Sequence, residues 1–172
     1  MCFVVTAPML PVKYLPFLAL LAALPLRAQM LWPGTAAGMT LDQVQHECPE
    51  AHAPGESAAE LPNSRGVELL RIDETVIAGH PFHVQFFFKG QQLVAVVLTE
   101  TGEIPNKDLD KFRDLLRGKY GLEYSTRSSE YIQVTWKAVQ TVIQLTWAPQ
   151  GHDIATLSIS YEAPIITETN RL

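Results

Sequence analysis

The stretch Pro81-Phe-His-Val-Gln-Phe-Phe-Phe-Lys-Gly-Gln-Gln-Leu-Val-Ala-Val-Val-Leu98 decides the fold. Apolar and aromatic residues fill it on both sides of one break at Lys89-Gly90, which is the pattern of two antiparallel strands joined by a tight turn. We expect a three-residue loop at 88–90, because its last residue is a glycine and such loops need a left-handed residue. The stretch therefore predicts a β-hairpin at the centre of the hydrophobic core.

The register of this hairpin determines which side chains reach the core. A three-residue loop pairs Phe82 with Val96 and Val84 with Val94. One face is then entirely apolar and consists of Phe82, Val84, Phe86, Val94, Val96 and Leu98. The other face carries His83, Gln85 and Phe87 beside Leu93, Ala95 and Val97. A two-residue turn would mix polar and apolar residues on both faces, so we favour the longer loop.

Two helices and four further strands are predicted around the hairpin. Thr40 and Gln43 have the spacing of a capping box, and Pro49 ends the first helix. Asn106 begins a second helix, which ends at Gly118 and Gly121 and has an apolar stripe of Leu109, Phe112, Leu115 and Leu116. Between the first helix and the sheet, residues 50–66 are expected to form a polar surface loop. The further strands are expected at 67–77, 131–137, 139–147 and 154–162.

The last three strands alternate between apolar and polar residues, which is typical of an antiparallel sheet with one buried face. The predicted inward residues are Ile132, Val134, Trp136, Val139, Thr141, Ile143, Leu145, Trp147, Ala155, Leu157, Ile159 and Tyr161. The predicted outward residues are Tyr131, Gln133, Thr135, Gln140, Gln144, Thr146, Thr156, Ser158 and Ser160. The fold class is therefore α+β, with two α-βββ halves at about 38–100 and 101–163. We expect them to form one antiparallel sheet with both helices on one face.

Residues 1–28 have the features of a secretory signal peptide. They contain no acidic residue, and the apolar run from Tyr14 to Leu26 follows Lys13 and precedes Arg27-Ala28. The run is too short, and too interrupted by proline, for a membrane span of about 20 residues. Either Met1 or Met9 is a possible start, and an uncleaved anchor or a buried helix is the alternative. We expect a periplasmic or secreted protein with one domain at 29–164, a loose tail at 165–172 and no stable membrane insertion after cleavage.

Composition limits the classes of partner. Removing 28 of the 172 residues leaves 144, enough for one hydrophobic core. Lys13 and Arg27 leave with the signal, so the net charge changes from −5 to −7, which argues against nucleic acid as a partner. Cys48 then remains as the single cysteine and cannot form an internal disulfide. It is either a buried small hydrophobe or the site of an intermolecular disulfide.

The run Gly38-Met-Thr-Leu-Asp-Gln-Val44 resembles the start of the small periplasmic domains of the BamE-like outer-membrane-assembly family. Those domains begin with Gly-Met-Thr or Gly-Met-Ser and a short helix before antiparallel strands. The α-βββ-α-βββ order is similar to the tandem arrangement of the β-lactamase inhibitor protein and its structural relatives. The resemblance implies a non-enzymatic protein that binds another protein through a sheet face or its loops. This chain differs from the assembly family in having no cysteine for lipidation after its apolar run.

Catalytic and metal-binding motifs are scarce. His46, Cys48 and His52 form one candidate metal or small-ligand site, although zinc needs three or four converging ligands and Pro49 interrupts the helix. Cys48 with a neighbouring histidine is also the sole Cys/His candidate for nucleophilic catalysis. No serine elbow, P-loop or dinucleotide motif is present. We therefore expect neither an enzyme nor a bound metal or cofactor.

The outward face of the last strands is the predicted protein-binding surface. Neutral polar side chains and an aromatic ring lose less free energy on desolvation than charged groups do. The predicted binding residues are Tyr131, Gln133, Thr135, Gln144, Thr146, Ser158 and Ser160, with His83 and Phe87 from the hairpin. The alternative is an ordinary solvated sheet face. The leading hypothesis is thus an exported, non-enzymatic module that binds a protein of the bacterial cell envelope, and the alternative is a periplasmic metal- or small-ligand-binding protein.

Overall fold

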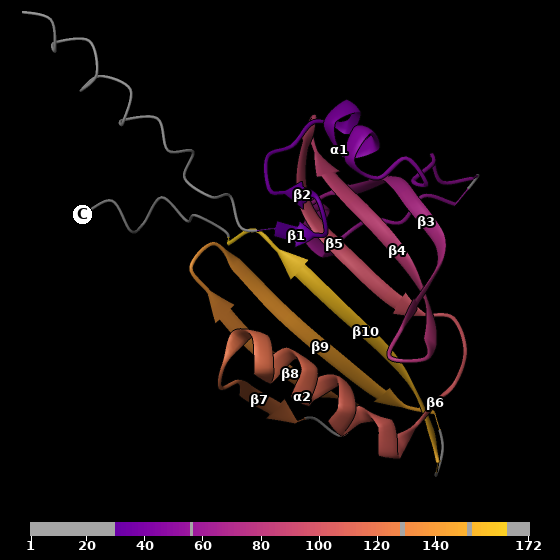
Figure 1. Cartoon of the computed structure of the whole chain (residues 1–172), viewed down its shortest axis with the longest axis vertical. Coiled ribbons are helices and arrows are strands. Elements are labelled where there is room, and N and C mark those ends of the chain that lie inside the picture. Colours follow the sequence, from indigo (N-terminus) through magenta and orange to yellow (C-terminus); the bar gives the residue numbers. More distant parts are fainter. Residues whose placement is uncertain (1–29, 56, 128–129, 151–152, 165–172) are drawn as a thin grey trace, which may run out of the picture.

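The computed structural model describes residues 30–55, 57–127, 130–150 and 153–164. The predicted signal peptide at 1–28 and the predicted tail at 165–172 lie outside these ranges. Within them the chain forms two α-helices and one large antiparallel sheet, which confirms the α+β class (Figure 1).

The elements follow one another in a simple order. The first part of the chain contains β1 (Met30–Trp32), β2 (Thr35–Ala36), α1 (Leu41–Glu47), the 3-10 turn η2 (Pro62–Ser64), β3 (Val67–Ile77), β4 (His80–Lys89) and β5 (Gln92–Glu100). The second part contains β6 (Ile104–Pro105), the 3-10 turn η3 (Asn106–Asp108), α2 (Leu109–Tyr120), β7 (Tyr124–Arg127), β8 (Ile132–Ala138), β9 (Thr141–Pro149) and β10 (Ile154–Glu162).

The helix ends follow from their sequences. The predicted capping box is confirmed, because the Gln43 amide donates to Thr40 Oγ1 and the Thr40 amide donates to Gln43 Oε1. Helix α2 runs through Gly118 and ends at Tyr120 with Gly121 as its C-cap, so the predicted stop is confirmed at Gly121 and wrong at Gly118. Gly121 has φ +83°, a conformation that glycine adopts without steric cost.

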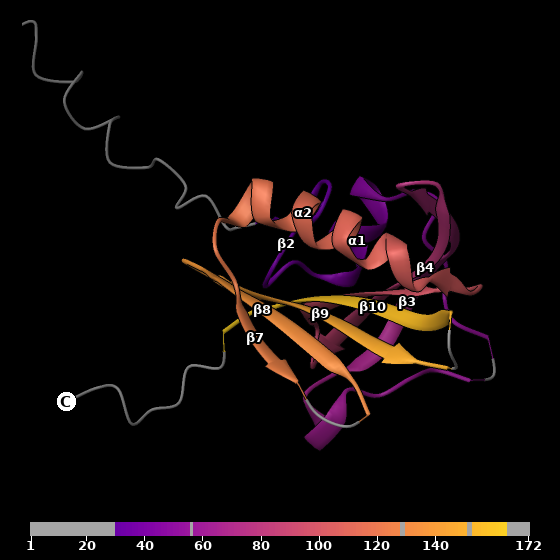
Figure 2. The ribbon, with the colours of Figure 1, turned by 90° about the horizontal axis from the view of Figure 1, so that it is seen from below.

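The large sheet has the strand order β3-β4-β5-β10-β9-β8-β7, and β6 pairs with β10. The strands that follow α1 therefore meet the strands that follow α2 where β5 pairs with β10. Residues paired in register share a face, and one row across six strands is Ile72, Val84, Leu98, Ile159, Leu145 and Val134. This row packs with Val44 of α1 and Phe112 and Leu116 of α2 in one buried cluster. Figure 2 shows the ribbons of α1, α2 and the strands of the sheet.

The predicted hairpin register is wrong. Lys89 pairs with Gln92, so the loop has two residues, Gly90 and Gln91. Gly90 is the first of them and has φ +63°, which is typical of a type II′ turn. The longer loop was predicted on the assumption that side chains alternate regularly along both strands. A β-bulge interrupts this alternation.

The bulge lies at Val94. Phe87 pairs with Ala95 and Phe88 pairs with Leu93, so Val94 has no partner of its own. Leu93 consequently lies in the core, and Val94 packs on the opposite face with Ala95. The predicted apolar face thus keeps Phe82, Val84, Phe86, Val96 and Leu98 but exchanges Val94 for Leu93.

The second part of the sheet needs two corrections. Four strands follow α2 instead of the predicted three, because Tyr124–Arg127 pairs with β8 as an edge strand. Val139, predicted to point inward, is 95% exposed. It lies with Gln140 in the turn between β8 and β9, which the pair Ala138–Thr141 closes.

Candidate functional site

The candidate site lies on the face of the sheet opposite the buried row of Ile72, Val84, Leu98, Ile159, Leu145 and Val134. Two rows of paired residues cross β4, β5, β10, β9 and β8 on this face. The first row is His83, Thr99, Ser158, Thr146 and Gln133. The second row is Gln85, Val97, Ser160, Gln144 and Thr135. Strand pairing therefore brings together residues up to 77 positions apart, from His83 to Ser160.

Six of the predicted binding residues are neighbours in these rows. They are Gln133, Thr135, Gln144, Thr146, Ser158 and Ser160, and we call them the outer polar face. All six are half-buried. Gln133 Nε2 donates to Gln144 Oε1 at 3.3 Å, so β8 and β9 are linked by their side chains as well as by their backbones. Tyr131, the seventh predicted residue on this part of the chain, precedes β8 and is exposed.

A shallow hollow of about 320 Å³ lies beside the outer polar face. Its lining residues are Val97, Thr99, Thr146, Ala148, Thr156, Leu157 and Ser158. Thr99 was not among the predicted site residues, because it lies on β5 and only the β5–β10 pairing brings it beside Ser158. The one signal in the sequence was that Thr99 falls on the same face of the hairpin as His83.

Phe87, which was predicted as a binding residue, does not belong to the accessible surface. Its side chain is only 3% exposed, because Leu61 of the segment before β3 packs on it together with Ala95. His83 is exposed, and its Nδ1 is hydrogen-bonded to the backbone carbonyl of Asp73. The segment 57–66 therefore covers part of the face that β3, β4 and β5 would otherwise present.

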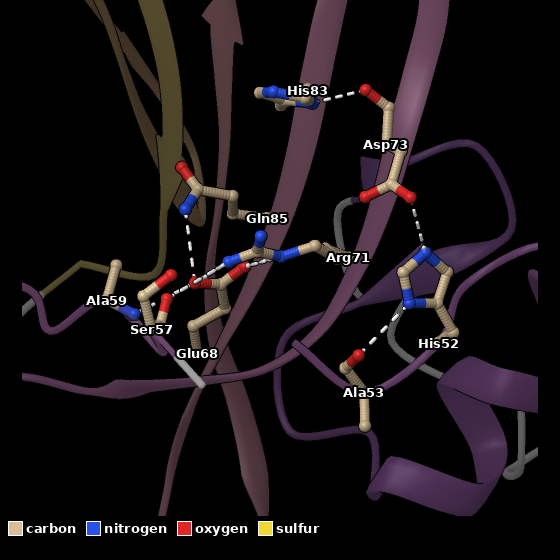
Figure 3. Close-up of polar contacts among 9 residues, drawn as sticks. All are labelled: His52, Ala53, Ser57, Ala59, Glu68, Arg71, Asp73, His83 and Gln85. Carbon is tan, nitrogen blue, oxygen red and sulfur yellow. Dashed lines mark hydrogen bonds and ion pairs between the residues drawn. The ribbon is translucent and has the colours of Figure 1, made fainter. Parts of the chain in front are cut away.

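A buried ion pair holds this segment in place (Figure 3). Glu68 is completely buried, and its carboxylate accepts hydrogen bonds from Arg71 Nε at 2.7 Å and Nη2 at 3.0 Å. The backbone amide of Ala59 and the side chain of Gln85 donate to the same carboxylate at 2.9 and 3.2 Å. Arg71 Nη2 also donates to the Ser57 carbonyl. The hydrogen bonds to Glu68 raise the pKa of Arg71.

Sequence reasoning missed this ion pair for a physical reason. Residues three apart in a regular strand point to opposite faces. The bulge at Leu69, between the pairs Glu68–Phe87 and Leu70–Phe86, brings Glu68 and Arg71 onto the same face.

No family model, curated protein or solved structure matches this chain. None of the helices in the described part of the chain is long and apolar enough to span a membrane. The proposals below therefore rest on the residues and the geometry alone.

The alternative site at His46, Cys48 and His52 is spread over three different environments. His46 is exposed on α1, whereas Cys48 is buried with its Sγ 3.8 Å from the Pro33 carbonyl. His52 Nε2 lies 3.1 Å from Asp73 Oδ2. Among residues 30–164, apart from the few that are not described, no three or more His, Cys, Asp or Glu side chains are grouped to hold a metal.

The Cys48 thiol has the properties of a structural cysteine. Burial raises its pKa to about 11, and the carboxylates of Glu50 and Glu47 add to the shift. A thiol with such a pKa is protonated at neutral pH and is a poor nucleophile, because the thiolate is the reactive form. This environment gives no support to catalysis by Cys48.

Glu100, at the end of β5, is another residue with a shifted pKa. Its side chain is buried, and Oε2 has no hydrogen-bond partner among the described residues. Burial raises the pKa of Glu100, while a hydrogen bond from the Gly102 amide and the nearby His80 partly oppose the shift. The folded state therefore prefers the protonated form more than the unfolded state does.

We expect Glu100→Gln to raise the thermal midpoint at pH 8 and to lose this advantage as the pH falls. The stability linked to a raised pKa is fully present below the unfolded value of about 4.3 and is lost as the pH rises through the folded value. Thermal unfolding by circular dichroism between pH 8 and about pH 4.5 measures the difference. The exposed Glu74→Gln is the control and should show no such trend. A difference between Glu100→Gln and wild type that does not change with pH would contradict the assignment.

Proposed function

We propose that this protein is an exported, non-enzymatic module of the bacterial cell envelope that binds a protein partner through the outer polar face. The observation that carries the proposal is the set of six neutral hydrogen-bonding side chains in two rows on three adjacent strands. The features of a signal peptide in residues 1–28 support export.

The chemistry of this surface suits protein recognition. Among its six side chains none is charged, so a partner can cover them without desolvating an ion. Each side chain can donate or accept a hydrogen bond, and protein interfaces carry about one hydrogen bond per 100–200 Å². The adjacent hollow gives a protruding side chain of the partner a place to dock.

We also propose that the chain consists of two halves, each a helix followed by antiparallel strands, and that the helices cover one side of the sheet and leave the outer polar face to a partner. The joint burial of Val44, Phe112 and Leu116 with one set of strand residues supports this arrangement. The resemblance to BamE-like assembly domains and to the tandem β-lactamase inhibitor fold belongs to the same proposal.

A triple substitution tests the surface. A photo-crosslinking residue at Thr146 should capture a specific envelope protein that the same probe at Gln45 on α1 does not capture. Changing Gln133, Thr135 and Gln144 together to arginine should weaken binding of that protein by about tenfold or more, because three charges would need desolvation. Thermal unfolding of the variant should remain close to wild type, since the three side chains are only half-buried.

The matched control adds the same charge elsewhere. Gln45, Gln91 and Gln150 are exposed and lie outside the outer polar face, so their triple arginine variant should bind the partner normally. Undiminished binding by the Gln133, Thr135 and Gln144 variant would show that the partner uses another surface.

A further inference from the structure

A cavity of about 390 Å³ lies on the helix side of the sheet, away from the outer polar face. It lies over the junction between β5 and β10, because the paired residues Leu98 and Ile159 of these strands line it. Helix α1 packs against β3 and helix α2 packs against β8, so the short strand β1 is the element that contacts both β5 and β10 between them. Three residues of β1 cannot fill the space between two helices, and a cavity remains.

The walls of this cavity are almost entirely apolar. Leu98 and Ile159 form its floor, Leu115 and Leu116 of α2 form one wall, and Met30 and Trp32 of β1 form the other. Met30 is 59% exposed and Leu115 is 56% exposed, so apolar side chains from β1 and α2 flank the mouth of the cavity.

One end of the cavity is polar. Lys119 is the one charged residue among its described lining residues, and its Nζ lies 5.1 Å from the centre of the Tyr120 ring. No carboxylate of the described chain forms an ion pair with Lys119. Tyr161 lines the cavity as well, and burial together with the neighbouring Tyr120 raises the pKa of its hydroxyl, which therefore stays neutral.

We propose that this cavity binds a free fatty acid, with the acyl chain between α2 and β1 and the carboxylate beside Lys119. The volume falls at the lower end of the range for small-molecule sites, about 300–1,000 Å³, and the lining has the expected apolar walls with few polar groups. A protein partner would need about 800 Å² of its own surface buried, which a cavity of this size does not offer. Lys119, the one cation among the described lining residues, selects an anionic head group. The inference is independent of the function proposed above, because the two sites lie on opposite sides of the sheet.

Calorimetric titration of the purified full chain with saturated fatty acids from octanoate to palmitate, each below its micellar concentration, tests the proposal. Affinity should rise by about fourfold for each added methylene and then level off when the cavity is full. An affinity that continues to rise with chain length would indicate partitioning without a defined site. Co-sedimentation with phosphatidylcholine vesicles separates the two sources of acyl chains, and binding to vesicles without saturable binding of free fatty acid would overturn the proposal.

Substitutions identify the site within the cavity. Lys119→Gln should weaken dodecanoate binding by about tenfold while changing dodecanol binding by less than about twofold, because only the acid has a charge to pair. Leu115→Glu, at the exposed mouth, should repel dodecanoate and leave the fold intact. Lys107→Gln removes the same charge from exposed η3 and should have no effect. Equal weakening by Lys107→Gln, or equal loss of dodecanol by Lys119→Gln, would refute the assigned carboxylate position.

Discussion

Replacing Arg71 with alanine is expected to lower the free energy of unfolding by about 3 kcal/mol or more. The substitution leaves the Glu68 carboxylate completely buried without its cation. The Gln85 side chain and the Ala59 amide still donate to Glu68, but neither carries a charge. The hydrogen bond from Arg71 Nη2 to the Ser57 carbonyl is lost as well, which should loosen the segment before β3. Urea unfolding followed by circular dichroism measures the loss.

Two further variants distinguish the buried pair from an ordinary surface pair. Glu68→Leu combined with Arg71→Met removes both charges and should recover most of the lost stability, because a buried pair can often be replaced by apolar residues of similar volume. Asp110→Asn breaks the Arg113–Asp110 pair, in which the aspartate is 69% exposed, and should cost less than about 1 kcal/mol. If Arg71→Ala costs no more than Asp110→Asn, the Glu68 carboxylate is reached by water.

Local patterns in the sequence were sufficient for most elements. Strands β3 and β10 coincide with the predicted ranges, and the capping box of α1 is confirmed. The alternation in β8, β9 and β10 correctly separated inward from outward residues, apart from Val139 at the turn. These features depend on side-chain period and capping, which neighbouring residues determine.

The remaining features depend on contacts between distant parts of the chain. The bulges at Leu69 and Val94 add one residue to a strand, and no local pattern distinguished them from regular alternation. They account for the wrong hairpin register and for the missed Glu68–Arg71 pair. The burial of Phe87 depends on Leu61, which lies 26 residues before it in a segment rich in turn residues. The outward positions of the candidate site on β8, β9 and β10 were thus predicted from the sequence. On β4, His83 is exposed as expected, whereas Phe87 is buried.

Trp136→Ala should be the most destabilising single substitution in the second part of the chain, with a loss of about 3–5 kcal/mol. Trp136 is the largest fully buried side chain and lies in β8, which packs against α2. Its Nε1 donates to the carbonyl of Gly121 at 3.0 Å, so the substitution both opens a cavity and removes the donor at the end of α2. Such a loss is a large share of a typical stability of about 5–15 kcal/mol. Chemical unfolding monitored by circular dichroism would give its size.

Two companion variants show which part of the effect comes from the position in the sheet. Trp136→Phe keeps an aromatic ring but loses the hydrogen bond to Gly121, so it should cost less, about 1–3 kcal/mol. Val139→Ala, only three residues further on, should change the free energy of unfolding by less than about 0.5 kcal/mol, because Val139 lies exposed in the β8–β9 turn. A loss of more than 1 kcal/mol at Val139, by the same measure, would mean that strand β9 begins earlier and that Val139 points into the core. Together the three variants show whether the burial of a side chain, and not its place in the alternating pattern, determines its contribution to stability.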